Sequence, residues 1–391
     1  MVLPGVGQSA ATEFRAKSAA TLSWATATQR GATIFDSPMT RAAKALVAVS
    51  ALFAVLLNGA CSNSPDPLEA VEYDVPHKFI GKDGKAARDL SGIACAPGQS
   101  VRHCLVIDDE GDSAQWATLE GTSFVAGEPM PLIGESDGDV TFGTRPEVDC
   151  PSGDGAFGEL DGEGVAFAAP YYYVVGSHGC SRKKGEFRAS SFILARLSDG
   201  QQGRVETTFR LTDVLRHATI VNAYFGKNLD GDNGLNIEGL AVQGDQLIVG
   251  LRAPSIDGRA FLVRMEIGPL FAKGDGPAAS ATTIPIAVAE GAGIRDLTKL
   301  ADGRLLLLLG PAQDQELPYS LARVELPSSP DPNVPIKVHT LAELPEIADD
   351  DTIGKAEAVV VLSETDAELE VLVLFDGLKD GAPRKFRVLL H

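Results

Sequence analysis

Charged side chains recur at one position of a pattern that the chain repeats five times. Glu163, Glu238 and Glu357 occupy this position in three copies, and Ser91 and Arg295 occupy it in the other two. Carboxylates that converge on a poorly solvated site repel one another, so they need a cation, water or basic partners. Hard oxygen ligands suit Ca²⁺ best. We therefore predict calcium as a cofactor, held by Glu163, Glu238, Glu357 and Asp109.

The same residues allow two further interpretations. In a metal-dependent hydrolase of phosphoesters or carboxyl esters, the glutamates would be metal ligands or general bases, and His178 and Arg252 would orient the substrate. The candidate catalytic residues are then Glu163, Glu238, His178 and Arg252. In a purely structural role, each Glu caps backbone N–H groups or pairs with an arginine, and His178 is a structural hydrogen-bond donor.

The elements that position these side chains are short strands. In each copy a turn leads into an apolar strand, and a second apolar strand follows after a tight link. The first strands read LSGIA, GEGVA, IEGLA, IRDLT and AEAVV, and their equivalent positions are 72, 75, 57 and 62 residues apart. This spacing holds four strands with long loops and is typical of an all-β propeller.

We predict five four-stranded blades, or six if residues 111–150 contain another. A strand within residues 71–80 would complete the last blade and close the ring. In an antiparallel blade, the start of the first strand and the end of the second lie at the same end. The charged residues at these positions should therefore share one mouth of the central channel. They are Asp89, Asp108, Asp109, Glu110, Asp161, Glu163, His178, Glu238, Arg252, Arg295, Glu357 and Asp376.

The N-terminal region reads as an export signal. Met39 opens a basic stretch that leads into an apolar run over residues 45–57, and Cys61 follows. As a helix this run is about 20 Å long, short of the roughly 30 Å of a bilayer core. The string LLNGAC resembles a bacterial lipoprotein box, which implies lipidation of Cys61. Ser62 after the cysteine implies sorting to the outer membrane.

We therefore expect a lipid-anchored periplasmic protein, with ordinary cleavage and secretion as the alternative. Residues 1–60 would be signal peptide and upstream extension, with Met39 as the true start. Residues 61–70 would be a tether, and residues 71–391 a single propeller domain.

The remaining cysteines form an even set, as two disulfides in an oxidising periplasm would require. Cys95 and Cys104 flank the link between the first two strands of one blade, and Cys150 and Cys180 belong to two loops at the mouth. Four free buried thiols are the alternative.

The chain is strongly acidic. It has 391 residues, with 34 Lys and Arg against 53 Asp and Glu, and a net charge of −19. After position 60 there remain 29 basic and 51 acidic residues, so the acidity belongs to the predicted domain. A nucleic-acid partner is disfavoured, because polyanions need a concentrated basic surface. We expect a monomer with a small-molecule or polymer ligand.

Several strings carry a resemblance to a known family. YYYVVGSHGCSRKK from Tyr171, NIEGLA from Asn236 and GLRAP from Gly250 resemble the bacterial secreted family called domain of unknown function 3616. The resemblance implies a propeller and no established reaction. The Glu-Gly strand starts are more distantly similar to phytase-like and esterase-like propellers, in which mouth carboxylates hold calcium and substrate. The leading hypothesis is a ligand-binding propeller. The rivals are the hydrolase and a protein-interaction scaffold.

Overall fold

The computed structural model describes residues 68–98, 100–200, 204–274 and 279–390, which belong to one compact unit. Cys61 and the predicted signal segment lie outside the described residues, as does most of the tether. Among the described residues, no helix is long and apolar enough to cross a membrane.

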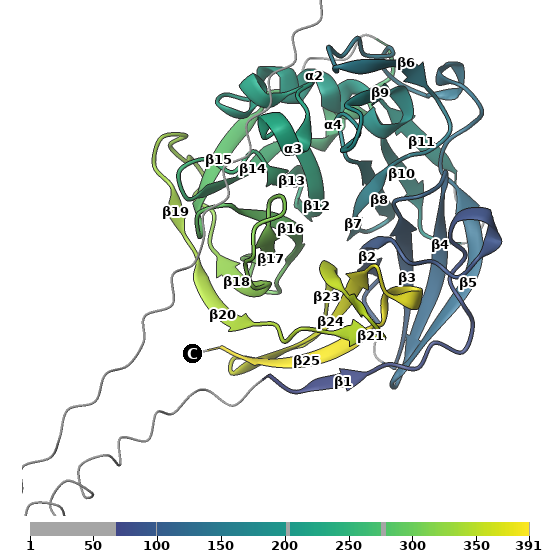
Figure 1. Ribbon diagram of the computed structural model, residues 1–391, viewed down its shortest axis with the longest axis vertical. Helices are drawn as coiled ribbons and strands as arrows, with labels where there is room; N and C mark the ends of the chain where they lie inside the picture. The colour runs from purple at the N-terminus through teal and green to yellow at the C-terminus, as the bar shows by residue number, and fades with distance from the viewer. Residues whose placement is uncertain (1–67, 99, 201–203, 275–278, 391) are drawn as a thin grey trace, which may run out of the picture. The chain divides into compact units, whose positions relative to one another are not determined.

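Five antiparallel four-stranded sheets form a ring around a central axis, which confirms a five-bladed propeller (Figure 1). We number the blades in chain order. Blade 1 contains β2 (Leu90–Cys95), β3 (Val101–Asp108), β4 (Ser113–Glu120) and β5 (Ser123–Pro131). Blade 2 contains β7 (Gly162–Ala168), β8 (Tyr171–Gly176), β10 (Leu194–Ser198) and β11 (Val205–Thr208). Residues 113–131 thus complete blade 1 and form no sixth blade.

The remaining blades follow the same order. Blade 3 contains β12 (Asn236–Gln243), β13 (Gln246–Ala253), β14 (Arg259–Glu266) and β15 (Thr282–Ala287), and the short β19 (Ile336–Lys337) extends it in parallel. Blade 4 contains β16 (Ala292–Lys299), β17 (Leu305–Pro311), β18 (Ser320–Val324) and β20 (His339–Glu343). Blade 5 contains β23 (Lys355–Glu364), β24 (Glu368–Asp376), β25 (Arg384–Leu389) and β1 (Ala70–Glu72).

The two ends of the domain close the ring in one blade. β1 pairs with β25 in the register Ala70↔Phe386 to Glu72↔Arg384, which confirms the predicted closure, although the strand itself is shorter than the predicted segment. Because β1 supplies the outer strand of blade 5, the last sheet gains its fourth strand from the start of the domain.

Short elements lie in the connections between the strands. Two β-pairs are β6 (Ser152–Ala156) with β9 (Glu186–Arg188), and β21 (Ala348–Asp349) with β22 (Thr352–Ile353). The helices are α2 (Arg210–His217), α3 (Leu229–Asp232) and α4 (Ile267–Leu270), with 3₁₀ turns η1 (Lys82–Gly84), η2 (Asp137–Asp139), η3 (Ala189–Phe192), η4 (Val221–Tyr224) and η5 (Lys379–Gly381). β11 ends at Thr208, and the chain does not continue as a strand but enters α2 at Arg210. Leu211, Val214 and Leu215 are buried at helical spacing instead.

The core lies between the blades. Each inner strand, the one nearest the axis, contacts the inner strands of both neighbouring blades in the closed order β2, β7, β12, β16 and β23. Apolar side chains such as Leu251, Phe261 and Leu307 are fully buried between the sheets. Both predicted disulfides are present, Cys95–Cys104 and Cys150–Cys180.

Each inner strand carries a β-bulge at the same place, where one residue has no partner on the second strand. The register skips Ser91, Glu163, Glu238, Arg295 and Glu357, the same five positions that recur in the sequence. A bulge re-aims the side chain of the extra residue and bends the strand. The five repeats therefore share one local backbone device, and it sets the direction of the charged side chains.

Glycines after the bulges let the inner strands approach one another closely. A Cβ on Gly239 would lie 2.4 Å from Leu297 Cδ2, and one on Gly92 would lie 2.6 Å from the Glu163 carbonyl oxygen. In blade 4 the equivalent residue is Asp296, whose carboxylate accepts hydrogen bonds from Leu297 N and Val359 N, each at 2.7 Å. Asp296 thereby joins blade 4 to blade 5.

Candidate functional site

The five bulge residues form an axial ring at one end of the propeller. All are buried, from 1% exposure at Arg295 to 8% at Glu163. The ring contains three carboxylates, one guanidinium and one hydroxyl. Arg252, near the end of β13, adds a second guanidinium. The structure thus brings together five of the twelve charged residues that were predicted to share one mouth, namely Glu163, Glu238, Arg252, Arg295 and Glu357.

Two of the three ring glutamates are neutralised by arginines. Arg252 Nη1 lies 2.7 Å from Glu238 Oε1, and Arg295 Nε lies 2.9 Å from Glu238 Oε2. Arg295 Nη2 also forms an ion pair with Glu357 Oε1. Arg252 Nε donates a hydrogen bond to the Ala312 carbonyl at 2.8 Å. The two Arg295 contacts are close enough to be ion pairs, but they are not aligned well enough to be hydrogen bonds. We call these four charged residues the axial ion network.

Glu163 is the exception in the ring. Its side chain is buried, with only 8% exposure, and yet it has no hydrogen bond or ion pair within the described residues. Burial and the neighbouring carboxylates of Glu238, Asp161 and Asp109 raise its pKa well above the ordinary value, and Arg252 opposes this. An unpaired buried carboxyl is costly, so the site favours a proton or a cation at Glu163.

Glu163 belongs to a wider set of carboxyl groups at the same end of the axis. Burial and neighbouring carboxylates raise the pKa of Asp109 to about 9, and burial is also the main cause that raises the pKa of Asp108 to about 6. Burial and a hydrogen bond with Asp376 raise the pKa of Asp89 to about 7. Burial raises the pKa of Asp161 as well, against a hydrogen bond from Ser177. We call Asp89, Asp108, Asp109, Asp161, Glu163 and Asp376 the acid cluster.

Cations lie at the rim of the acid cluster. Lys355 Nζ is 2.6 Å from Asp376 Oδ2, and Lys82 Nζ lies 3.4 Å from Glu110 Oε1 and 3.3 Å from Glu159 Oε1. None of these contacts reaches Asp109 or Glu163. The oxygens Asp108 Oδ2 and Asp109 Oδ1 are buried without a hydrogen-bond partner in the described structure. The interior of the cluster therefore has acceptor oxygens that remain unused.

His178 lies beside this mouth but is closed off from it. Its side chain is fully buried, and Nδ1 lies 2.9 Å from the Gly176 carbonyl oxygen. Burial lowers its pKa to about 4, so the imidazole is neutral at pH 7. The ring stands edge-on to Phe192 at 5.7 Å. This environment suits a structural donor and does not expose the side chain to a substrate.

The basic loop after β8 is largely paired with acids. Arg182 bridges Asp230 Oδ1 at 2.9 Å and Asp314 Oδ1 at 3.2 Å, and Arg188 pairs with Glu159. The Asp-rich stretch from Asn228 forms an Asx-type turn, in which Asn228 Oδ1 accepts a hydrogen bond from Gly231 N at 2.8 Å. Salt bridges thus connect these loops to one another at the rim of the mouth.

The predicted calcium ligands do not converge as a preformed cage. Glu238 and Glu357 face arginines, which leaves Glu163 and Asp109 from the predicted set. Over residues 68–390, gaps excepted, no group of three or more His, Cys, Asp or Glu side chains has an arrangement that could hold a metal ion.

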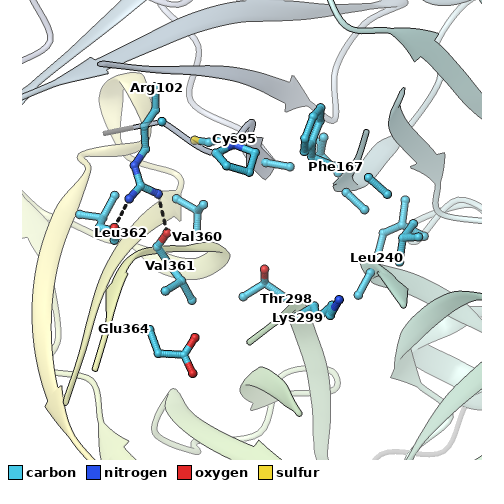
Figure 2. Close-up of a pocket in the computed structure, with 18 of the residues that line it drawn as sticks. Cys95, Arg102, Phe167, Leu240, Thr298, Lys299, Val360, Val361, Leu362 and Glu364 are labelled. Atoms are coloured by element: carbon cyan, nitrogen blue, oxygen red, sulfur yellow. Dashed lines mark hydrogen bonds between the residues drawn. The ribbon is translucent and has the colours of Figure 1, made fainter. Parts of the chain in front are cut away.

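A cavity of about 630 Å³ lies at the other end of the axis, and sequence reasoning did not anticipate it. It is lined by the later residues of all five inner strands, two or more positions beyond each bulge. Figure 2 shows Phe167, Leu240 and Val360 around one central space, with Thr298 and Lys299 on the wall between them. The sequence signal that could have indicated this cavity is the apolar half of the first strands, which begins about two positions after the bulge residue.

Several solved structures resemble this chain at low sequence identity. An α-L-arabinofuranosidase from Podospora anserina, solved with cellotriose, is 11% identical, covers 83% of this chain and 98% of its own, and has a TM-score of 0.41. A protein from Lactobacillus plantarum is 13% identical over 80% and 73%, with a TM-score of 0.31. A thermostable family-43 glycoside hydrolase is 9% identical over 77% and 88%, with a TM-score of 0.34. These values support no argument about activity.

No curated protein matches the sequence. A family model does match it, over residues 147–203 and 195–387, which together make up more than half of the chain. The matched region contains the inner strands of blades 2 to 5 and four of the five ring residues. The chain therefore belongs to the family described as Protein of unknown function (DUF3616).

Proposed function

We propose that this propeller binds a positively charged ligand at the acid cluster, with Glu163 as the central contact. The observation that carries this proposal is the contrast within the axial ring. Glu238 and Glu357 have arginine partners, whereas Glu163 is equally buried and has none among the described residues. A cation in contact with Glu163 would supply the missing charge.

The electrostatics favour exchange of a proton for the cation. Burial and mutual repulsion raise the pKa of Asp109 to about 9, so this carboxyl holds a proton near neutral pH, and the same causes raise the pKa of Glu163 well above its ordinary value. A cation lowers the pKa of the carboxyl groups that it contacts, and bound protons then leave. Affinity should consequently rise with pH. This behaviour distinguishes the acid cluster from a surface patch of carboxylates that are already ionised.

The ligand could be inorganic or organic. Ca²⁺ takes six to eight oxygen ligands, so the few free carboxyl groups would have to be supplemented by water or backbone carbonyls. An organic ammonium ion needs fewer contacts, which suits a cluster in which Glu163 and Asp109 have no ion pair among the described residues. Titration calorimetry of the full chain with CaCl₂ and, separately, with spermidine tests the inorganic and the organic ligand.

We expect saturable binding of one of the two probes, and loss of at least tenfold in affinity in Glu163→Gln. The matched control is Glu186→Gln, which alters a partly exposed carboxylate of the rim and should leave affinity nearly unchanged. Absence of saturable binding for both probes, or equal affinity in Glu163→Gln, would refute the proposal.

A second candidate is acid–base hydrolysis at the same cluster. The observation that favours it is the separation of two adjacent pKa values, about 6 at Asp108 and about 9 at Asp109, because paired groups of this kind can serve as base and acid. A panel of phosphate and carboxyl esters, with and without Ca²⁺, tests it. Turnover by the unmodified protein that disappears in both Asp109→Asn and Glu163→Gln supports hydrolysis. If the unmodified protein turns over no ester faster than these variants do, hydrolysis is refuted.

A further inference from the structure

The cavity at the end of the axis opposite the acid cluster has the size and chemistry of a second site. Its volume of about 630 Å³ falls within the range of small-molecule pockets, roughly 300–1,000 Å³. We propose that it binds a small apolar molecule that carries an anionic group. The cavity is a different site from the acid cluster, so this proposal goes beyond the proposed function.

The axial ion network separates the two ends. In β12, Glu238 belongs to the network, and Leu240 to Val242 line the cavity. In β16, Arg295 belongs to the network, and Thr298 and Lys299 line the cavity. Glu238 and Arg295 are at most 3% exposed, and no residue of the acid cluster lines the cavity. A molecule in the cavity is therefore not in contact with the acid cluster.

The walls of the cavity combine polar and apolar surface, and the apolar part comes from several inner strands. Val165, Phe167, Leu240 and Val360 contribute side chains from three different blades, and the half-buried Phe167 presents a ring to the open space (Figure 2). Transfer of apolar ligand surface from water to the apolar part of these walls is favourable. These walls favour an aliphatic or aromatic body.

The charge of the lining selects the other end of the ligand. The charged lining residues are Arg102, Lys299 and Glu364, so the cavity carries net positive charge in a strongly acidic protein. Arg102 donates hydrogen bonds to the carbonyls of Val361 and Leu362, which hold the guanidinium in place without neutralising it. Lys299 has no hydrogen bond or ion pair within the described part of the chain.

Glu364 is the single opposing charge, and it forms no ion pair with Lys299 in the described part of the chain. Its Oε2 accepts a hydrogen bond from Ala301 N at 2.7 Å. Lys299 can therefore form an ion pair with a ligand, and it lines the cavity together with apolar residues. Complementarity of charge and surface points to an amphipathic anion such as a carboxylate or sulfonate with a hydrocarbon or aromatic body.

Two fluorescent dyes of similar shape separate the apolar and the ionic parts of this proposal. N-phenyl-1-naphthylamine is neutral, and 8-anilino-1-naphthalenesulfonate adds an anionic group to nearly the same rings. Fluorescence titration of the folded full mature chain should show binding of both dyes, with higher affinity for the sulfonate. In Lys299→Gln the affinity for the sulfonate should fall three- to tenfold, and that for the neutral dye should stay unchanged.

Controls locate the dyes. Lys337→Gln removes an exposed lysine outside the cavity and should have no effect. Thr298→Trp places an indole in the cavity and should abolish binding of both dyes, and Ala168→Phe is a second blocking variant should the first fail to fold. Glu163→Gln should bind both dyes as the unmodified protein does, which keeps this test separate from that of the acid cluster.

The proposal is overturned if the native protein binds neither dye, or if a folded blocking variant binds both unchanged. It is also overturned if Lys299→Gln and Lys337→Gln have the same affinity for the sulfonate. Loss of dye binding in Glu163→Gln would place the dyes at the acid cluster instead and would equally refute it.

Discussion

Arg252 and Glu238 form a buried ion pair on the propeller axis, with Nη1 2.7 Å from Oε1 and both residues under a tenth exposed. Burial alone would lower the pKa of Arg252, but the Glu238 carboxylate outweighs it and the net pKa is raised. The pair thus holds its charge in a site that would otherwise disfavour it. Glu238 also contacts Arg295, so one carboxylate serves two guanidinium groups.

Removal of Glu238 should be strongly destabilising. Glu238→Gln leaves Arg252 and Arg295 buried with a single remaining carboxylate partner, and loss of one member of a buried pair costs about 3–5 kcal/mol. Denaturant unfolding measures this change. The control is Glu368→Gln, which breaks a more exposed pair with Arg387 and should cost much less stability. Equal losses in the two variants would mean that the axial ion network contributes no more than a surface contact.

The acid cluster should make stability depend on pH in a defined direction. The folded-state pKa of Asp109, about 9, lies above the ordinary value of 3.8, so the folded state binds the proton more tightly than the unfolded state. Stability from this group is complete below pH 4 and is lost as pH rises towards 9.

Asp109→Asn should therefore raise the Tm relative to the unmodified protein at pH 9, and should raise it much less at pH 5. Melting curves at the two pH values give the difference. For the exposed carboxylate variant Asp366→Asn, the shift should be the same at both pH values. If Asp109→Asn lowers the Tm at pH 9, the Asp109 carboxylate stabilises the fold when ionised, contrary to this account.

Gly239 should be sensitive to the smallest added side chain. A Cβ there would lie 2.4 Å from Leu297 Cδ2 and 3.0 Å from the backbone of Asp296, so β12 and β16 would have to separate. Overpacking of this kind costs about 1–3 kcal/mol. Gly239→Ala and the control Gly111→Ala, where no atom lies within 4 Å of the new Cβ, are compared by denaturant unfolding. Similar stability of the two variants would contradict the close approach of the inner strands.

The Cys150–Cys180 disulfide should contribute more stability than Cys95–Cys104. The two bonds close loops with sequence separations of 30 and 9, and the loop-entropy relation gives about 3.6 and about 2.6 kcal/mol. Paired Cys→Ser replacement at each site, followed by unfolding under the same conditions, measures the two values. The reverse order would show that loop closure is not the main source of the effect.

The sequence was sufficient for the fold because the repeat is carried by local signals. The bulge residue and the apolar residues after it recur at Glu163 and Glu238, and the strand order follows from these repeats. The side-chain contacts between blades could not be predicted in this way. Whether a glutamate meets an arginine depends on the twist between blades, so the contact of Arg295 with both Glu238 and Glu357 could not be read from spacing. Neither could the link from Asp296 to Val359 N.

The role of His178 shows the same limit. Its position after Gly176 and Ser177 predicts a place at the mouth, and the structure puts it there in a left-handed backbone conformation with φ of 51°. Its burial depends on Phe192, which follows a separate loop. The cavity around Leu240 and Val360 was missed for a related reason, because apolar residues on a first strand can equally well fill a core.

The most direct test of the central claim is the number of protons released when a cation binds at Glu163. Unbuffered protein at pH 7 is titrated with CaCl₂ and with spermidine in a pH-stat, alongside Glu163→Gln. The account predicts release of about one proton for each cation bound, because bound protons leave carboxyl groups with raised pKa values, and a clearly smaller release in the variant. Binding without proton release, or identical release in Glu163→Gln, would contradict it.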